Sequence, residues 1–244
     1  YYNRGYDIEY LNPIIFYRPV EFSKNSPDNV LMGANLRLLF SNTKIYSQIL
    51  LDDLNISRQK DSDKNYKGGF FQNKFAYQLG VKFSFKSINS LIEYNQVQPY
   101  TYAHKESMQS YTHMNQALAH PLGANFKEII FITNYPINDW IFNCKLTLAK
   151  SGLDSNNTHY GQDIFTSDFE AQGDNQEYSY GNYNGQGVLT DMLTAYFEAS
   201  YSLKSFNLFG SVYYVDKKSD LIDHNYLWLS IGIRNFPFSA FKDY

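Results

Sequence analysis

Residues 73–85, NKFAYQLGVKFSF, alternate between large apolar and small or polar side chains. Its odd positions carry large apolar side chains, namely Phe75, Tyr77, Leu79, Val81, Phe83 and Phe85. Its even positions carry small or polar ones, namely Lys74, Ala76, Gln78, Gly80, Lys82 and Ser84. Alternation with a period of two predicts a strand, because successive side chains of an extended chain point to opposite faces. On a helix the same residues would scatter around the axis and leave no face to bury.

The length of this strand suits a membrane. At about 3.3 Å per residue its apolar face extends roughly 40 Å, and with the ~45° tilt usual in membrane barrels it spans roughly 28 Å. This matches the core of a bilayer. A strand in a soluble sandwich alternates in the same way, with its apolar face packed on a second sheet. Taken alone, this segment leaves both alternatives open.

The composition narrows the class of protein. The chain has 244 residues, a net charge of −3 and 18% aromatic residues, with a mean hydropathy of −0.45. So many aromatics exclude a disordered chain, and the weak acidity argues against nucleic acid as a partner. The sequence contains no run of 18 apolar residues, which excludes transmembrane helices but not barrel strands, because the apolar residues of barrel strands alternate with polar ones.

Cys144 is the only cysteine, so the chain can form no internal disulfide. It shares the apolar face of its segment with Trp140, Phe142, Leu146 and Leu148, and we interpret it as a small hydrophobic residue rather than a nucleophile. The chain begins at Tyr1 without an initiator methionine or a signal peptide, so we expect a mature or truncated sequence.

Alternating segments recur along the chain. We place them at 4–11, 31–40, 44–53, 73–85, 91–102, 126–133, 139–150, 191–203, 206–216 and 225–236. Many are near twice the usual 5 or 6 residues of a soluble strand, and no helical period interrupts them. The connections alternate between long ones, at 12–30, 54–72, 103–125, 151–190 and 217–224, and short ones, at 41–43, 86–90, 134–138 and 204–205. Tight periplasmic turns and long extracellular loops give this asymmetry in outer-membrane barrels.

We therefore predict an all-β fold, an antiparallel transmembrane β-barrel in one domain over residues 1–244, with 103–125 and 151–190 as long extracellular loops. In lipid every backbone polar group must find a partner, so the sheet has to close. The ten strands could close by themselves or could be the last ten of a larger barrel. The ending NFPFSAFKDY, with Phe236, Phe238, Phe241 and Tyr244, is similar to the aromatic signal that barrel-assembly machinery recognises.

Several segments carry a resemblance to a known family. NPIIFYRPVEFSKNSPDNVLMGANL, QVQPYTYAHKESMQSYTHMNQALAHPLGANF and GIRNFPFSAFKDY resemble outer-membrane barrels of the RemB-like gliding-motility type, related to Wzi-like capsule-assembly barrels. The resemblance implies a bacterial outer-membrane barrel that acts at the cell surface, in polysaccharide attachment or in motility and secretion. Members of that family are longer, which implies that this chain is the C-terminal part of such a barrel.

Charged and amide side chains supply the first candidates for binding. Glu93 and Asn95 alternate with Ile92 and Tyr94, so we expect them to point into the lumen. Arg18 and Glu21 lie among aromatics in the 12–30 loop. They could bind an anionic sugar or constrict a pore, or could form an ion pair that only anchors the loop.

The 103–125 loop contains His104, His113 and His120. Three imidazoles could bind a metal, but their spacing fits no metal motif, and polar residues that fold a long loop over the barrel mouth are the simpler interpretation. In the same loop Pro121 and Gly123 predict a rigid turn, and Asn125 can hydrogen-bond local backbone. We therefore expect no metal and no cofactor.

The 151–190 loop places Tyr160, Tyr178, Tyr180 and Tyr183 among Asn, Gly, Gln and Ser. Such a mixture suits a surface that binds glycan or protein, although a loop packed on itself is equally compatible. The sequence has no G-x-S-x-G, H-E-x-x-H or P-loop motif, so we expect no enzymatic activity. The expected function is presentation of loops to surface polysaccharide or to motility and secretion partners, in contact with outer-membrane lipid. The alternatives are a passive channel and a soluble β-sandwich that binds a ligand.

Overall fold

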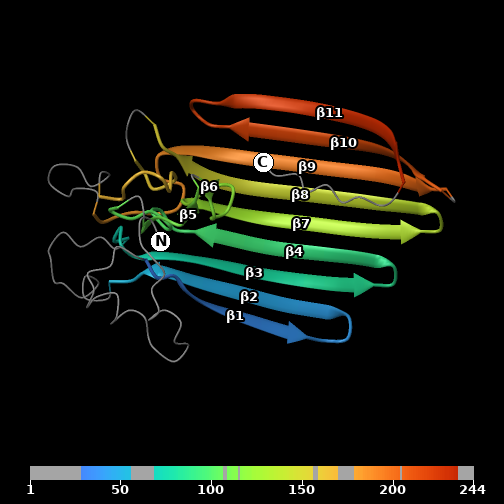
Figure 1. Ribbon diagram of the computed structural model, residues 1–244. Coiled ribbons are helices and arrows are strands. Elements are labelled where there is room, and N and C mark those ends of the chain that lie inside the picture. The colour runs from blue at the N-terminus through green and yellow to red at the C-terminus, as the bar shows by residue number, and fades with distance from the viewer. Residues whose placement is uncertain are drawn as a thin grey trace.

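The computed structural model describes residues 29–55, 69–106, 109–114, 116–155, 159–169, 179–203 and 205–235 (Figure 1). Its main element is a nine-stranded antiparallel sheet with the order β1-β2-β3-β4-β7-β8-β9-β10-β11. The strands are β1 (Met32–Leu39), β2 (Thr43–Asp53), β3 (Lys74–Phe85), β4 (Ile88–Val97), β7 (Phe126–Ile137), β8 (Trp140–Leu153), β9 (Val188–Ser202), β10 (Asn207–Lys218) and β11 (Asp223–Arg234). The predicted all-β antiparallel fold is confirmed. The expected strand at 4–11 lies outside the described residues.

Each strand of the large sheet pairs with the strand before it and the strand after it in this order, as in a meander. Within the described ranges β1 and β11 each have one unpaired edge, so this part of the chain forms an open sheet. The arrangement is consistent with an outer-membrane barrel, and closure stays a prediction. None of the described residues forms a helix long and apolar enough to cross a membrane.

The connections are sorted by length between the two ends of the sheet. Figure 1 shows the tight turns at 40–42, 86–87 and 138–139 at one end, called the turn end, and the long connections at the other, called the loop end. Several expected boundaries were wrong. The connections expected at 86–90 and 134–138 are only 86–87 and 138–139, because β4 begins earlier and β7 ends later than predicted. The connection expected at 217–224 is only 219–222, because β10 and β11 continue pairing to Lys218 and Asp223. The strand expected to reach residue 102 stops at Val97, because Pro99 has no N–H for a ladder and Tyr100 has a φ of 64°.

The face that carries the odd residues of β3, called the outer face, is an apolar band. Side chains that lie opposite one another across the strands form rows, and one row runs through Leu79, Tyr94, Ile129, Leu148 and Leu193. On β8 the band reaches from Trp140 to Leu148, about 27 Å along the strand or roughly 20 Å at a ~40° tilt, comparable with the ~25 Å band of membrane barrels.

Aromatic and charged side chains flank this band. At the turn end Trp140 packs on Tyr201 with their ring centroids 5.0 Å apart, and toward the loop end Tyr77 packs on Tyr94 at 5.9 Å. Beyond the tyrosines a charged row crosses the outer face through Lys127, Lys150, Asp191 and Lys218. Aromatic girdles at both edges of an apolar band are typical of proteins that span a bilayer.

The buried residues lie on the opposite face, called the inner face, toward the loop end. A core cluster joins strand residues such as Ala76, Val97 and Met192 to Leu122 and Ala124 of the 98–125 connection. The cover over this face is a set of loop segments, at 98–106, 109–114, 116–125, 154–155, 159–169 and 179–187, which we call the loop cap. The cap includes a small hairpin that the sequence did not predict, β5 (Thr112–His113) with β6 (Gln116–Ala117) (Figure 1).

Candidate functional site

The inner face carries polar side chains in register. Near the turn end one row crosses β3, β4, β7, β8 and β9 through Ser84, Asn89, Asn134, Asn143 and Glu198. Asn134 donates to Asn143 at 2.7 Å, and Asn143 donates to Glu198 at 3.2 Å. Arg234 of β11 donates to the same Glu198 carboxylate at 3.1 Å. The row is therefore a continuous hydrophilic strip with its acid neutralised by an arginine.

A second polar group lies closer to the loop cap. Glu93 and Asn95 are on the inner face, where the alternation places them. Asn95 donates to Glu93 at 3.0 Å and to the buried Glu128 at 2.7 Å. Glu128 also pairs with His120 Nε2 at 2.9 Å, and the His120 ring stacks on Phe126 with centroids 4.5 Å apart. His120 thus attaches the loop cap to the wall of the sheet.

Tyr46 lies flat across the neighbouring strand. Its register partner is Gly80, and a Cβ at Gly80 would come within 2.2 Å of the tyrosine ring. The ring therefore occupies the space that a side chain would fill, and its hydroxyl donates to Glu93 on the strand beyond. The ammonium groups of Lys44 and Lys82 lie 5.9 and 5.8 Å from the ring centroid, within cation–π range.

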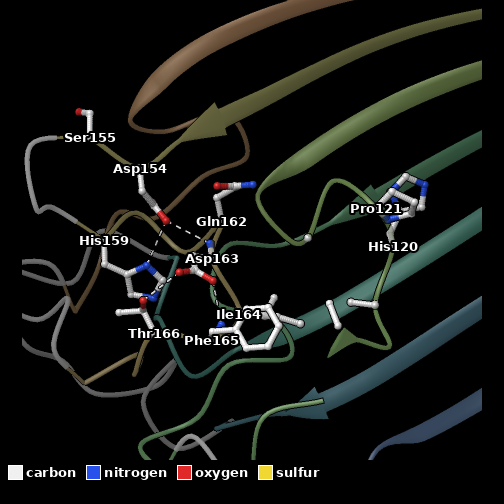
Figure 2. Close-up of a pocket in the computed structure, with 13 residues that line it drawn as sticks. His120, Pro121, Asp154, Ser155, His159, Gln162, Asp163, Ile164, Phe165 and Thr166 are labelled. Atoms are coloured by element: carbon white, nitrogen blue, oxygen red, sulfur yellow. Dashed lines mark hydrogen bonds and ion pairs between the residues drawn. The ribbon is translucent and has the colours of Figure 1, made fainter. Parts of the chain in front are cut away.

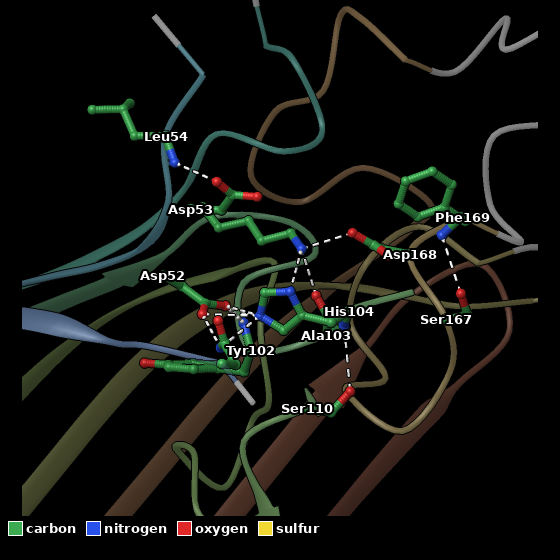
Figure 3. Close-up of polar contacts among 12 residues, drawn as sticks. Asp52, Asp53, Leu54, Tyr102, Ala103, His104, Ser110, Ser167, Asp168 and Phe169 are labelled. Atoms are coloured by element: carbon green, nitrogen blue, oxygen red, sulfur yellow. Dashed lines mark hydrogen bonds and ion pairs between the residues drawn. The ribbon is translucent and has the colours of Figure 1, made fainter. Parts of the chain in front are cut away.

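A buried ionic network holds the cap at the end of β2 and β3 (Figure 3). Lys74 is 1% exposed, and its ammonium donates to Asp168 at 2.7 Å and to the Ala103 carbonyl at 2.6 Å. His104 lies beside it and contacts Lys74 through Nδ1 at 3.5 Å and Asp52 through Nε2 at 2.9 Å. A β-bulge at Asp52 interrupts the ladder, and a bulge of this kind re-aims a side chain.

Asn125 joins the two long segments of the cap. Its side chain is fully buried and donates to the carbonyls of Gly152 at 3.0 Å and Gln186 at 2.9 Å, while it accepts from the Gly185 amide at 2.7 Å. Its φ of 60° lies in the left-handed region that asparagine tolerates better than most residues. The expected partners were local, but the observed ones lie far along the chain, so Asn125 is a clasp between loops.

A hollow of about 800 Å³ lies between residues 117–123 of the cap on one side and residues 154–155 and 159–166 on the other (Figure 2). Asp154 accepts hydrogen bonds from the amides of Tyr160 at 2.6 Å and Asp163 at 3.0 Å and contacts His159 Nδ1 at 3.3 Å. Burial opposes ionisation, but these bonds outweigh it and hold the pKa of Asp154 below its usual range. Phe165 lines the same hollow and is 46% exposed, which gives a polar pocket with an aromatic rim.

The predicted histidines do not converge. His104 and His120 each pair with a separate carboxylate, and His113 is exposed in the small hairpin. Across the described ranges no group of three or more His, Cys, Asp or Glu side chains could hold a metal ion.

The predicted tyrosines are also dispersed. Tyr160 lies beside the hollow, Tyr180 packs on Phe70 with centroids 5.2 Å apart, and Tyr183 is 65% exposed. Tyr178, Arg18 and Glu21 fall outside the described residues, so their predicted binding roles stay predictions.

The residues that fix the cap could not be predicted from the sequence. Asp168 and Gln186 lie in the long 151–190 loop, where nothing distinguishes them from other polar residues. Gly80 did offer a signal, because an isolated glycine in a strand often marks a close approach of another group.

Comparison with known proteins gives one distant likeness. No protein-family model and no curated protein matches the chain. A solved structure described as porin refined at 1.8 Å resolution aligns with 84% of this chain at a TM-score of 0.43 and 8% sequence identity. The alignment covers 51% of that porin, so the chain spans about half its length. A likeness of this degree identifies neither a family nor a function.

Proposed function

We propose that the protein is an outer-membrane β-barrel whose polar inner face forms a passive path for hydrophilic solutes, narrowed by the loop cap. One observation carries the proposal. In a soluble antiparallel sheet the apolar face is covered and the polar face meets water. Here the polar inner face is covered toward the loop end by the protein's own loops, whereas Leu79, Leu148 and Phe197 on the apolar outer face remain 51%, 47% and 47% exposed.

This inverted polarity is what a bilayer requires. Lipid takes the place of a second sheet against the apolar band, and water lies against the amides of the inner face. The soluble-sandwich alternative needs a protein layer over the outer face, and the described residues supply none there. We expect outer-membrane lipid as the surroundings of the band, and we assign no enzymatic role.

The cap supports a constriction that is fixed rather than mobile. Lys74, Asp168 and Asn125 are almost fully buried and bonded between loops and strands. Breaking such contacts leaves buried polar groups without partners, so opening the cap is costly. A fixed cap would limit the size of permeating solutes without a gating step.

The test is conductance of the full protein in a planar bilayer. The proposal predicts steady open channels whose conductance increases when Asn125→Asp places a carboxylate against the Gly152 and Gln186 carbonyls and loosens the cap. Lys127→Gln on the outer face is the matched control and should leave the conductance unchanged. A purified, membrane-inserted protein that carries no current would overturn the channel.

A second function is supported by the hollow between the cap segments. Carboxylates, amides and an exposed aromatic ring, here Asp163, Gln162 and Phe165, are the groups with which proteins hold sugars. We propose surface polysaccharide attachment, as in capsule assembly, as this second function. Loss of glycan retention on cells carrying Phe165→Ala, with normal insertion of the barrel, would support it, and unchanged retention would contradict it.

A role in gliding motility or secretion is a further part of the proposal and rests on the family resemblance. It would use the same loop end, the side on which the long connections gather. Crosslinking from an exposed position of the cap, such as Tyr183, to a motility or secretion protein is the measurement that tests it. Failure to crosslink any such partner in gliding cells would count against this role.

A further inference from the structure

We propose that the inner face of β1–β3 holds an anion-binding site that makes the channel prefer anionic solutes. This inference rests on the proposed channel and names the class of solute. The site is built around Lys44 and Lys82.

The two lysines lie directly opposite each other. Lys44 of β2 and Lys82 of β3 are register partners, and both side chains are on the inner face. Like charges at directly opposite positions of a sheet destabilise it. Among the described residues neither lysine forms an ion pair with a carboxylate. Two adjacent, uncompensated ammonium groups are what an anionic ligand would neutralise.

Tyr46 explains how the pair is tolerated without a carboxylate. Both ammonium groups are within 6 Å of its ring, and the negative face of an aromatic ring attracts cations. The ring attracts each cation without cancelling its charge. Gly80 fixes the ring in this place by leaving room beneath it.

The nearest inner-face carboxylates are engaged elsewhere. Glu93 accepts hydrogen bonds from the Tyr46 hydroxyl and from Asn95, and Glu128 is paired with His120. Farther along the wall, Glu198 is neutralised by Arg234. The Glu93 carboxylate keeps its charge, but it is directed at the Tyr46 hydroxyl and the Asn95 amide, and among the described residues it forms no ion pair with Lys44 or Lys82.

The surroundings form a pocket suited to an oxyanion. A hollow of about 670 Å³ at the turn end is lined by Lys44, Lys82 and Lys86 together with Ser84, Asn89 and Asn134. Ammonium, amide and hydroxyl groups are hydrogen-bond donors that match phosphate and carboxylate oxygens. Rings of Lys and Arg select anions in pores, and Arg37, the register partner of Tyr46, adds a further cation beside the pair.

The experiment measures ion selectivity of the full protein in a planar bilayer under a potassium chloride gradient. The reversal potential of the wild type should lie closer to the equilibrium potential of chloride than to that of potassium. Lys44→Gln/Lys82→Gln should shift it toward potassium, since each charge lost at about 4 Å from the anion in water lowers anion occupancy by roughly fivefold. Inorganic phosphate should reduce the chloride current of the wild type and not that of the double variant.

Two further variants keep the outcome decisive. Lys44→Arg/Lys82→Arg retains both charges and should retain chloride preference, while Lys127→Gln/Lys150→Gln removes two charges from the outer face and should change nothing. Heat-modifiable migration on gels shows whether each variant is folded. An unchanged reversal potential in the glutamine variant, or loss of preference in the arginine variant, overturns the anion site and leaves the channel. No current from the wild type overturns the channel itself.

Discussion

Replacing Asn125 by alanine tests the loop cap at its most connected residue. The substitution removes three buried hydrogen bonds, to Gly152, Gly185 and Gln186. At about 1 kcal/mol each these contribute roughly 3 kcal/mol to the stability of the closed cap. Alanine at a φ of 60° adds about 1 kcal/mol of strain. A total of about 4 kcal/mol raises the population of the open cap on the order of a thousandfold.

Limited proteolysis in detergent micelles measures this population. When opening is fast compared with cleavage, the cleavage rate within the cap follows the fraction of open molecules. Asn125→Gly is the matched variant, because it loses the same three hydrogen bonds but adopts a φ of 60° without strain. It should therefore be cleaved roughly a hundredfold faster than the wild type. Cleavage of Asn125→Ala within threefold of the wild-type rate would refute the clasp. A glycine variant as sensitive as the alanine one would refute the contribution of backbone strain.

Other changes test single contacts. Gly80→Ala should displace the Tyr46 ring and lower the unfolding temperature in detergent, equivalent to about 1–3 kcal/mol, whereas Gly210→Ala, with no heavy atom within 4 Å of the added Cβ, should not. Because the pKa of Asp154 is lowered in the folded cap, its contribution is present above the unfolded value of about 3.9 and is lost as the pH falls through the folded value. Protease resistance of the cap should therefore drop in acid, and less so in Asp154→Asn. Cys144, spin-labelled in vesicles, should be relaxed strongly by oxygen and weakly by a water-soluble nickel complex; the reverse ratio would place it in water.

The strands of the sheet were predictable because their signal, the alternation of side chains, lies within each segment of sequence. Period-two alternation from Phe75 to Phe85 reports a strand and its two faces without reference to the rest of the chain. The errors arose where pairing partners decide the boundary. The last hairpin continues to Lys218 because β10 and β11 stay in register, and β4 stops early because Pro99 leaves the ladder.

The site was less predictable because its bonds are distant in sequence. Lys74 was correctly expected on the polar face, but its partner Asp168 is 94 residues away, and the position of the partner depends on how two long loops fold. Asn125 was given a local role for the same reason. The polar residues of the 103–125 loop could suggest that the loop containing His104 folds over the barrel mouth. They could not suggest that His104 lies between Asp52 and Lys74.

Lipid, and no second protein layer, should cover the outer face. The chain has only two tryptophans, and they lie on opposite faces: Trp140 on the outer face beside Tyr201, and Trp228 on the inner face stacked on Tyr213. In vesicles of brominated lipid, fluorescence of the single-tryptophan variant Trp228→Phe should be strongly quenched, and that of Trp140→Phe should be quenched by aqueous iodide instead. If brominated lipid left Trp140 fluorescence unquenched, as it should leave that of Trp228, the outer face would not be in contact with lipid.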